Sequence, residues 1–300
     1  MLTGKAIEGL PEVRPGDDLS ALIAAAAGPV RDDDVLAIAH KIVSKAEGRI
    51  RRLADVRPQP RAIELAGQLD KDPRHVQVIL DESRQVLRAT RGVLICVTHH
   101  GFVCANAGVD ASNVPGEDTV VLLPQDPDAS ARYLRARLKD LLGVSPAILI
   151  TDSFGRAWRH GQVDVAIGCA GLQPSDDWRG RTDTTGRVLK ATWIASADEL
   201  AAAADLARTK DGALPLILIR GAGRHVTRHD GPGAGALILS EAPSALQLAG
   251  VAVVLIAVIT ATAPGVRALP KQVLGFRTDQ RPRTRAVVTG DVAAGSADQD

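Results

Sequence analysis

The spacing of hydrophobic residues along the chain predicts short strands separated by helices. Two apolar runs, residues 35–38 and 147–150, are typical of short strands, and the second reads as buried. A hairpin-like pair of strands with polar residues between them is expected within residues 92–103. Further strands are expected at residues 119–123, 188–194 and 214–219.

Helices are predicted where apolar residues recur every three or four positions. Asp17 and Asp18 precede Leu19 and an Ala-rich run, in the way that capping carboxylates precede a helix. Further helical patterns occupy residues 60–90 with a break at Pro73, residues 130–142 and residues 197–207. Some strands follow one another directly, whereas others alternate with helices. We therefore expect an α+β fold with mixed sheets, not a doubly wound parallel sheet.

The composition is ordinary for a globular protein and excludes few functions. Of 300 residues, 45% are hydrophobic and 24% charged, which suffices for one large domain or two modest ones. Aromatic residues make up 2% and the net charge is +1, so neither base stacking nor a global field favours nucleic-acid binding. Three cysteines without CxxC spacing argue against zinc. Without a signal peptide, they indicate a reducing cytoplasm.

A nucleotide would have to be held without a familiar phosphate loop, because the chain has neither GxxxxGK[ST] nor GxGxxG. The best candidate is residues 41–52, where five basic residues accompany one acid, Glu47. Positions 41, 45 and 49 share a face in a helix and in a strand alike. The row suits a polyphosphate, although a solvated basic edge is the commoner meaning of such a pattern. Its basic residues are Lys41, Lys45, Arg49, Arg51 and Arg52.

Two carboxylates follow apolar segments and could share one hard cation. Asp110 comes after an apolar segment, and Asp152 stands at the end of the strand expected at residues 147–150. Mg²⁺ and Mn²⁺ prefer oxygen ligands and retain waters that phosphates can replace. Either acid alone would serve as well as a helix cap or a turn former, so both interpretations stay open.

The polar segment 152–164 is expected to be a loop that faces solvent or a ligand. Arg156 and Arg159 within it could clamp a carboxylate or a phosphate, and we take them as candidate catalytic residues. His99 and His100 are adjacent, and adjacent residues of a strand point to opposite faces, so the two would not share one metal. We interpret them as structural histidines.

Together these segments resemble the coenzyme F420-0:γ-glutamyl ligase family over residues 8–222. The matching pieces occur in the family's order and spacing, which makes the set far more specific than any single block. They are residues 9–11, 16–19, 43–49, 100–110 with 112–113, 151–159, 161–162 with 164, 178–180 with 183, and 204–206.

The resemblance implies an α+β fold of the family's own topology, assembled as an intertwined homodimer. Residues 1–222 would form the catalytic domain, with two intertwined subdomains, and GTP would be a co-substrate. His40 is a departure, because relatives often have a small polar residue there. The implied GTP contacts are the stretch from about Arg208 to Pro215, including Lys210, together with Leu10, Pro11, Glu12, Val13, His40, Lys41, Lys45 and Asn113.

The resemblance also implies two divalent cations per site, Mg²⁺ or Mn²⁺, with K⁺ as a further candidate cofactor. Asp110 and Asp152 match the family's metal-binding acids, and Ser153 matches its hydroxyl ligand for a second metal. Lys210 stands where some members have a Gln that binds this metal. A charged lysine cannot coordinate, so the second metal would be held differently or replaced by the ammonium group.

The implied activity is GTP-dependent ligation in coenzyme F420 biosynthesis. Phosphoryl transfer to the terminal carboxylate of F420-0 or F420-1 would give an acyl phosphate. The amine of L-glutamate would then displace phosphate and form the γ-glutamyl amide bond. Lys45 would act with the metals to screen the two anions that meet in the first step. Two alternatives remain: another nucleotide-dependent phosphoryl-transfer enzyme or ligase on the same fold, and a non-catalytic, membrane-tethered member.

Residues 223–300 diverge from the family pattern. Within them, residues 242–266 carry no charge and are long enough to cross a bilayer. Pro243 and Pro264 bound the segment, however, and Ser244, Gln247, Thr260 and Thr262 interrupt it. We therefore expect a soluble element there, not a transmembrane helix, and a cytoplasmic protein.

Overall fold

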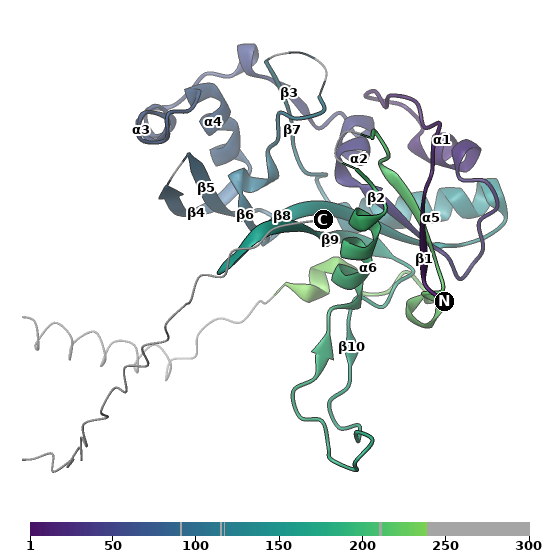
Figure 1. The fold of residues 1–300 in the computed structure, drawn as a ribbon. Helices are drawn as coiled ribbons and strands as arrows, with labels where there is room; N and C mark the ends of the chain where they lie inside the picture. The colour runs from purple at the N-terminus through teal and green to yellow at the C-terminus, as the bar shows by residue number, and fades with distance from the viewer. Residues whose placement is uncertain (91, 115, 117, 210–211, 239–300) are drawn as a thin grey trace, which may run out of the picture. The chain divides into compact units, whose positions relative to one another are not determined.

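The computed structural model describes residues 1–238 apart from residues 91, 115, 117 and 210–211. A five-stranded sheet forms its centre, in the order β1-β12-β2-β8-β9 (Figure 1). β2 and β8 are parallel, while the other neighbours are antiparallel, which confirms the expected mixed sheet. The strands are β1 (Thr3–Ala6), β12 (Leu216–Arg220), β2 (Val35–Ala39), β8 (Ala147–Arg156) and β9 (Arg159–Ala170).

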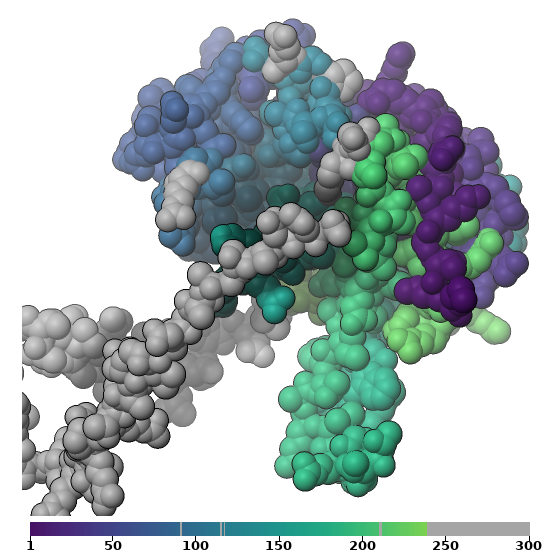
Figure 2. Space-filling view, in the orientation of Figure 1, coloured from purple at the N-terminus to yellow at the C-terminus, as the bar shows by residue number. Residues whose placement is uncertain are grey.

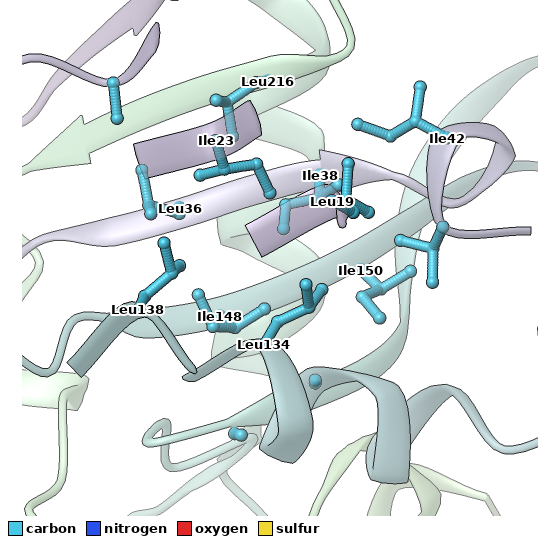
Figure 3. Packing of buried hydrophobic residues seen from close by; sticks show 14 of the residues in the cluster. Leu19, Ile23, Leu36, Ile38, Ile42, Leu134, Leu138, Ile148, Ile150 and Leu216 are labelled. Carbon is cyan, nitrogen blue, oxygen red and sulfur yellow. The ribbon is translucent and has the colours of Figure 1, made fainter. Parts of the chain in front are cut away.

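Helices cover both faces of this sheet. Leu36 and Ile38 of β2 point to one face, where they pack with Ile148 and Ile150 of β8 against α1 (Leu19–Ala26) and α5 (Pro127–Leu142) (Figure 3). The alternate β2 positions, 35 and 37, pack on the other face against α6 (Ser196–Leu206). Because both faces are buried, these strands are apolar without interruption.

The start predicted for α1 and the break predicted at Pro73 agree with the structure, whereas α5 begins at Pro127, three residues before its predicted start. α1 is capped by Asp18, whose side chain accepts a hydrogen bond from Ala21 N at 3.1 Å. Helices α3 (Pro60–Leu69) and α4 (Pro73–Asp81) are separated at the expected proline. Proline suits the first turn of a helix, where its missing N–H has no partner to lose.

Residues 83–90 are not helical, so the helix predicted up to residue 90 is wrong in its last part. They form β4 (Ser83–Thr90), which pairs with β5 (Val93–Thr98), and β5 pairs with β6 (Val103–Ala105). Pairing with β5, whose alternate side chains are buried, outweighs the local helical pattern. This sheet, α3, α4 and the pair β3 (Ile50–Arg52) and β7 (Thr119–Val121) surround a third hydrophobic cluster.

The polar segment 152–164 is a β-hairpin and not the predicted loop. β8 continues past residue 150 and pairs with β9 as far as Arg156 opposite Arg159. Strands that extend beyond the hydrophobic core can consist of polar residues. The composition of this hairpin therefore resembles that of a loop. The hairpin brings the two ends of the segment, at residues 152–153 and 164–165, side by side.

A two-stranded arm leaves the central fold between β9 and α6 (Figures 1 and 2). Its ladder consists of β10 (Asp176–Asp177) and β11 (Trp193–Ile194). The strand predicted at residues 188–194 is therefore present only in its last two residues. Arg179 stacks over Trp193 with 4.5 Å between guanidinium carbon and ring centroid, and Arg181 stacks over Trp178 at 4.8 Å.

The described chain beyond β12 packs on the central fold. Four short 3-10 turns occur in the described residues: η1 (Leu53–Asp55), η2 (Asn106–Gly108), η3 (Gly223–His225) and η4 (Ala234–Leu237). Arg135 of α5 binds Asp230 at 2.9 Å, and Asp128 accepts hydrogen bonds from Ala234 N and Gly235 N. Within the described residues no helix is long and apolar enough to span a membrane. Residues 242–266 lie outside them.

Candidate functional site

A cavity of about 880 Å³ opens at the edge where β2 and β8 end. It brings together the predicted GTP and metal residues except Lys210, which lies outside the described part of the chain. The lining comes from widely separated segments: residues 10–13, 39–42, 45, 110, 112–114, 151–153, 162, 164, 208–209 and 213–215.

The parallel pairing of β2 and β8 explains why basic and acidic residues meet here. Ala39 at the end of β2 stands opposite Thr151 of β8. α2 (His40–Ala46) begins at the next residue, and Asp152 follows Thr151 directly. Parallel strands end at the same edge of a sheet, so the first turn of α2 lies beside the acid of β8. The His40 Nε2 and Asp152 Oδ1 atoms are 3.3 Å apart.

An irregularity in β9 shapes this edge. Ile150 pairs with Gly168, but the next residue, Thr151, pairs with Ala166, so β9 has one extra residue at this point. Such a bulge changes the direction of the side chains that follow it. A side chain at Gly168 could not be accommodated, since its Cβ would lie 2.4 Å from the Pro127 carbonyl oxygen. The start of α5 therefore requires glycine next to the bulge.

A rigid loop carries the second acid. Asn106, Ala107 and Gly108 all have positive φ, at 51°, 53° and 72°, which non-glycine residues adopt only at a cost. Asp110 then exchanges two backbone hydrogen bonds with Val121, at 3.0 and 2.8 Å. These constraints fix the Asp110 backbone at the rim of the cavity.

The Asp110 carboxylate is bound closely by its neighbours. Its Oδ2 lies 2.6 Å from Lys41 Nζ and accepts a hydrogen bond from Ser112 Oγ at 2.9 Å. Its Oδ1 accepts one from Ser112 N at 2.7 Å. Burial acts to raise the pKa of Asp110, but the Lys41 and Ser112 hydrogen bonds outweigh it and hold that pKa below its ordinary value. Asp110 is therefore ionised over the neutral range, as a metal ligand must be.

Lys45, on α2, is almost completely buried and also lines the cavity. Its side chain is 6% exposed and its Nζ lies 2.5 Å from Glu12 Oε1, while the Glu12 side chain is 60% exposed. A buried ammonium requires an anionic partner. Because Glu12 stands at the solvent side and belongs to the lining segment 10–13, an incoming phosphate could replace it there.

Three residues that line the cavity have the chemistry to bind divalent cations. Asp110, Asp152 and Ser153 offer only oxygen atoms, which Mg²⁺ and Mn²⁺ prefer to nitrogen or sulfur. In the described part of the chain no group of three or more His, Cys, Asp or Glu side chains could hold a metal. Two carboxylates and a hydroxyl suit a cation that keeps waters and shares phosphate oxygens.

The structure places Arg156 and Arg159 outside the cavity. They face each other across the tip of the β8–β9 hairpin, where Arg156 donates to the His160 carbonyl at 3.1 Å. Trp158 between them is fully exposed and has a φ of 56°. The tip therefore presents two guanidinium groups to solvent, away from the lining acids.

His99 and His100 do not line the cavity. They lie in the turn that follows β5 and not on a strand. His99 Nε2 is 2.9 Å from the Asp81 carbonyl oxygen, and His100 Nε2 is 2.9 Å from that of Pro124. These contacts join the turn to the end of α4 and to the segment that precedes α5.

Sequence reasoning gave no role to Asp164 and Thr151, which line the cavity together with Arg208. Asp164 stands directly opposite Ser153. Symmetric pairing about the Arg156–Arg159 turn would have placed Gln162 opposite Ser153, because a register shift between Gly155 and Arg156 moves the partner to Asp164. Arg208 was reached only as the start of an implied GTP-binding stretch.

A cavity that gathers ammonium groups beside carboxylates is typical of an enzyme that acts on phosphorylated substrates with a divalent cation. The chain belongs to the F420-0:Gamma-glutamyl ligase family, whose model matches residues 9–221. This confirms the family expected from the sequence motifs.

Named relatives match over most of their length. The chain is 47% identical over 230 residues to a Methanopyrus kandleri protein named coenzyme F420:L-glutamate ligase, covering 75% of this chain and 90% of the relative. It is 46% identical over 222 residues to the Haloarcula marismortui protein of the same name, covering 72% and 85%. The Archaeoglobus fulgidus protein of that name is 44% identical over 216 residues, covering 72% and 86%.

Proposed function

We infer that this protein is a ligase that joins L-glutamate to the terminal carboxylate of coenzyme F420-0 or F420-1, in F420 biosynthesis. The family and the names of its relatives support the reaction. The observation in the structure that carries the inference is the single cavity that holds Lys41 and Lys45 beside Asp110 and Asp152. Ligation of a carboxylate needs such a place, because phosphoryl transfer must activate it first.

GTP is the proposed phosphoryl donor. Its polyphosphate would meet Lys41, Lys45 and His40 on α2, all three of which line the cavity. The segment 10–13 and Asn113 would form the walls around the rest of the nucleotide. Lys210 belongs to the same proposal but lies outside the described residues.

Two divalent cations, Mg²⁺ or Mn²⁺, would be held by Asp110, Asp152 and Ser153, and K⁺ is a further proposed cofactor. When bound, they would neutralise charge on the transferred phosphoryl group. Lys45 would serve the same end, since its buried ammonium acts in a medium of low dielectric constant.

The reaction proceeds in two steps. An oxygen of the coenzyme carboxylate attacks the γ-phosphorus of GTP, the bond to the bridging oxygen breaks, and GDP leaves. The amine of L-glutamate then attacks the acyl phosphate, phosphate leaves with the former carboxylate oxygen, and the amine loses its proton. The cavity contributes by bringing the reactants together and by screening their charges.

Arg156 and Arg159 have a more distant part in this proposal. At the exposed hairpin tip they are placed to bind a carboxylate or phosphate of an acceptor that extends out of the cavity. They would then raise affinity for the coenzyme without touching the reacting atoms.

A homodimer is also proposed. The arm at residues 176–194 has little core of its own, and its Trp193 is 55% exposed. Exposed tryptophan and stacked arginine are the residue types that are enriched in protein interfaces. The arm is thus the part of the described fold best suited to embrace a second copy. Light scattering of the full chain and of Trp193→Ala would test this, and a monomeric wild-type chain would contradict it.

The function is tested by incubating the purified chain with F420-0, GTP, Mn²⁺ and L-glutamate, followed by mass spectrometry. The expected product is heavier by one or more glutamate residues, with equivalent GDP formed. ATP in place of GTP should give much less product. GTP hydrolysis without a heavier coenzyme would favour another phosphoryl-transfer reaction on this fold.

A further inference from the structure

The carboxylate of Asp164 contacts several polar side chains that line the cavity. It is 2% exposed and stands opposite Ser153 in the β8–β9 hairpin. Its Oδ1 accepts a hydrogen bond from Ser153 Oγ at 2.6 Å, and its Oδ2 accepts one from Thr151 Oγ1 at 2.9 Å. The same Oδ2 lies 3.3 Å from Arg208 Nη1. These side chains all line the cavity.

The hydrogen bond to Asp164 sets the polarity of Ser153. A hydroxyl group has one proton, and Ser153 donates it to Asp164. Oxygen lone pairs are consequently what Ser153 presents to other groups, which is the polarity that a cation ligand requires. Thr151 and Ser153 also flank Asp152, so Asp164 restrains β8 on both sides of that acid.

Arg208 is oriented by the same carboxylate. Its side chain is 8% exposed, and its Nε and Nη2 atoms are buried without a hydrogen-bond partner in the described structure. These two nitrogens form one edge of the guanidinium, the arrangement that binds an oxyanion through two parallel bonds. Asp164 takes the remaining nitrogen, Nη1, and so fixes which edge is left for a ligand.

Leaving such an edge without an acceptor costs free energy. A buried donor without a partner is destabilising, and more so when it is charged. Burial lowers the pKa of Arg208, and the Coulombic attraction of Asp164 opposes that shift and favours the charged form. A charged, half-paired guanidinium in a cavity wall is explained by an anion that completes its bonds.

We propose that Asp164 is a positioning residue for the ligase reaction, which aims the Ser153 oxygen at a divalent cation and the Arg208 edge at a phosphate or carboxylate of a substrate. The proposal rests on the proposed function of the cavity. Asp164 touches no reacting atom. Its removal should therefore weaken ligand binding more than it weakens the fold.

The test compares Asp164→Asn with Asp198→Asn. Asp198 is a suitable control, because it is a partly buried acid that accepts a hydrogen bond from Ala166 N of the same strand β9 at 2.9 Å and does not line the cavity. Mn²⁺ affinity is measured by calorimetry without substrates, the KM for GTP by ligation, and the fold by urea unfolding. Asp164→Asn should lose about 10- to 100-fold in Mn²⁺ affinity and raise the KM for GTP, whereas Asp198→Asn should change both by less than about twofold.

A double-mutant cycle separates positioning from general damage. If Asp164 acts on the cation through Ser153, Asp164→Asn should have little further effect on Mn²⁺ affinity in a Ser153→Ala background. Asp164→Glu keeps the charge but displaces the oxygens, and it should lose Mn²⁺ affinity while remaining folded.

Wild-type Mn²⁺ affinity in folded Asp164→Asn or Asp164→Glu would overturn the proposal, as would full additivity in the cycle. In these cases a wild-type chain that binds Mn²⁺ and ligates glutamate leaves the proposed function standing. A wild-type chain that binds no Mn²⁺ would instead remove the metal part of the proposed function, and the Asp164 proposal with it.

Discussion

Lys41 Nζ lies 2.6 Å from Asp110 Oδ2, and the same ammonium donates to Ser112 Oγ at 2.7 Å. This ion pair links Lys41, which is proposed to bind GTP, to Asp110, which is proposed to bind metal. Asp110 Oδ2 already accepts from Lys41 Nζ and from Ser112 Oγ, so a divalent cation on this oxygen would compete with the ammonium group. Metal binding at Asp110 should therefore release Lys41 toward the phosphates, so that the two ligands favour each other.

Removal of Lys41 should affect metal and nucleotide in opposite directions. Lys41→Met deletes the cation that competes for Asp110, so Mn²⁺ measured alone should bind several-fold more tightly. GTP should bind more weakly, since one phosphate contact is lost. Calorimetry with each ligand separately checks this. A parallel loss for both ligands would show that Lys41 does not compete with metal.

The acid limb of metal binding should depend on Lys41. A carboxylate with a depressed pKa keeps its ligand form until pH falls through that lowered value, so wild-type Mn²⁺ binding should persist below about pH 4 if the fold survives. Lys41→Met removes a cause of the depression, so the fall of its Mn²⁺ affinity from its own plateau should begin at higher pH. Identical acid limbs for the two proteins would contradict the assignment of Asp110 as a ligand.

Asp110→Asn and Asp152→Asn should each abolish metal-dependent ligation while the protein stays folded. Loss of a charged ligand should cost on the order of a thousand-fold in rate or more. Asp140→Asn, on the exposed side of α5, serves as the control. Near wild-type rates with unchanged metal dependence in both site variants would show that the metal assignment is wrong.

Lys45→Ala should weaken GTP binding more than glutamate use. Lys45 is buried and central to the basic row, whereas Lys139, which is exposed on α5, offers a matched control as Lys139→Ala. Saturation curves for GTP and for glutamate give the two constants. A rise confined to the glutamate constant would move Lys45 to the amino-acid site.

Arg135 should be essential to stability and not to chemistry. It is buried and donates to the Pro146 and Thr227 carbonyls at 3.2 and 2.8 Å, besides binding Asp230. Arg135→Ala leaves those acceptors unpaired, so we expect a loss of about 3 kcal/mol in the free energy of unfolding. Arg137→Ala, half-exposed on the same helix, should cost less than about 1 kcal/mol. Equal losses in urea unfolding would contradict this account.

The sequence predicted the parts of the fold that depend on local patterns. Asp18 predicts the start of α1, and the apolar run at residues 35–38 predicts β2, because capping and burial act through neighbouring residues. The helix predicted for residues 83–90 and the loop predicted after residue 150 are wrong, since the conformation of both segments depends on the strands with which they pair. Motif order indicated the residues at the cavity. Asp164 gained its role only from pairing with Ser153, which no local pattern contains.

In the proposed reaction, GTP activates the coenzyme carboxylate as an acyl phosphate in this cavity. The most direct measurement uses F420-0 whose terminal carboxylate carries ¹⁸O, incubated with the enzyme, GTP, Mn²⁺ and L-glutamate. Mass spectrometry of the released phosphate should find one ¹⁸O atom for each amide bond formed. Phosphate free of ¹⁸O, released while glutamate is added, would contradict the account.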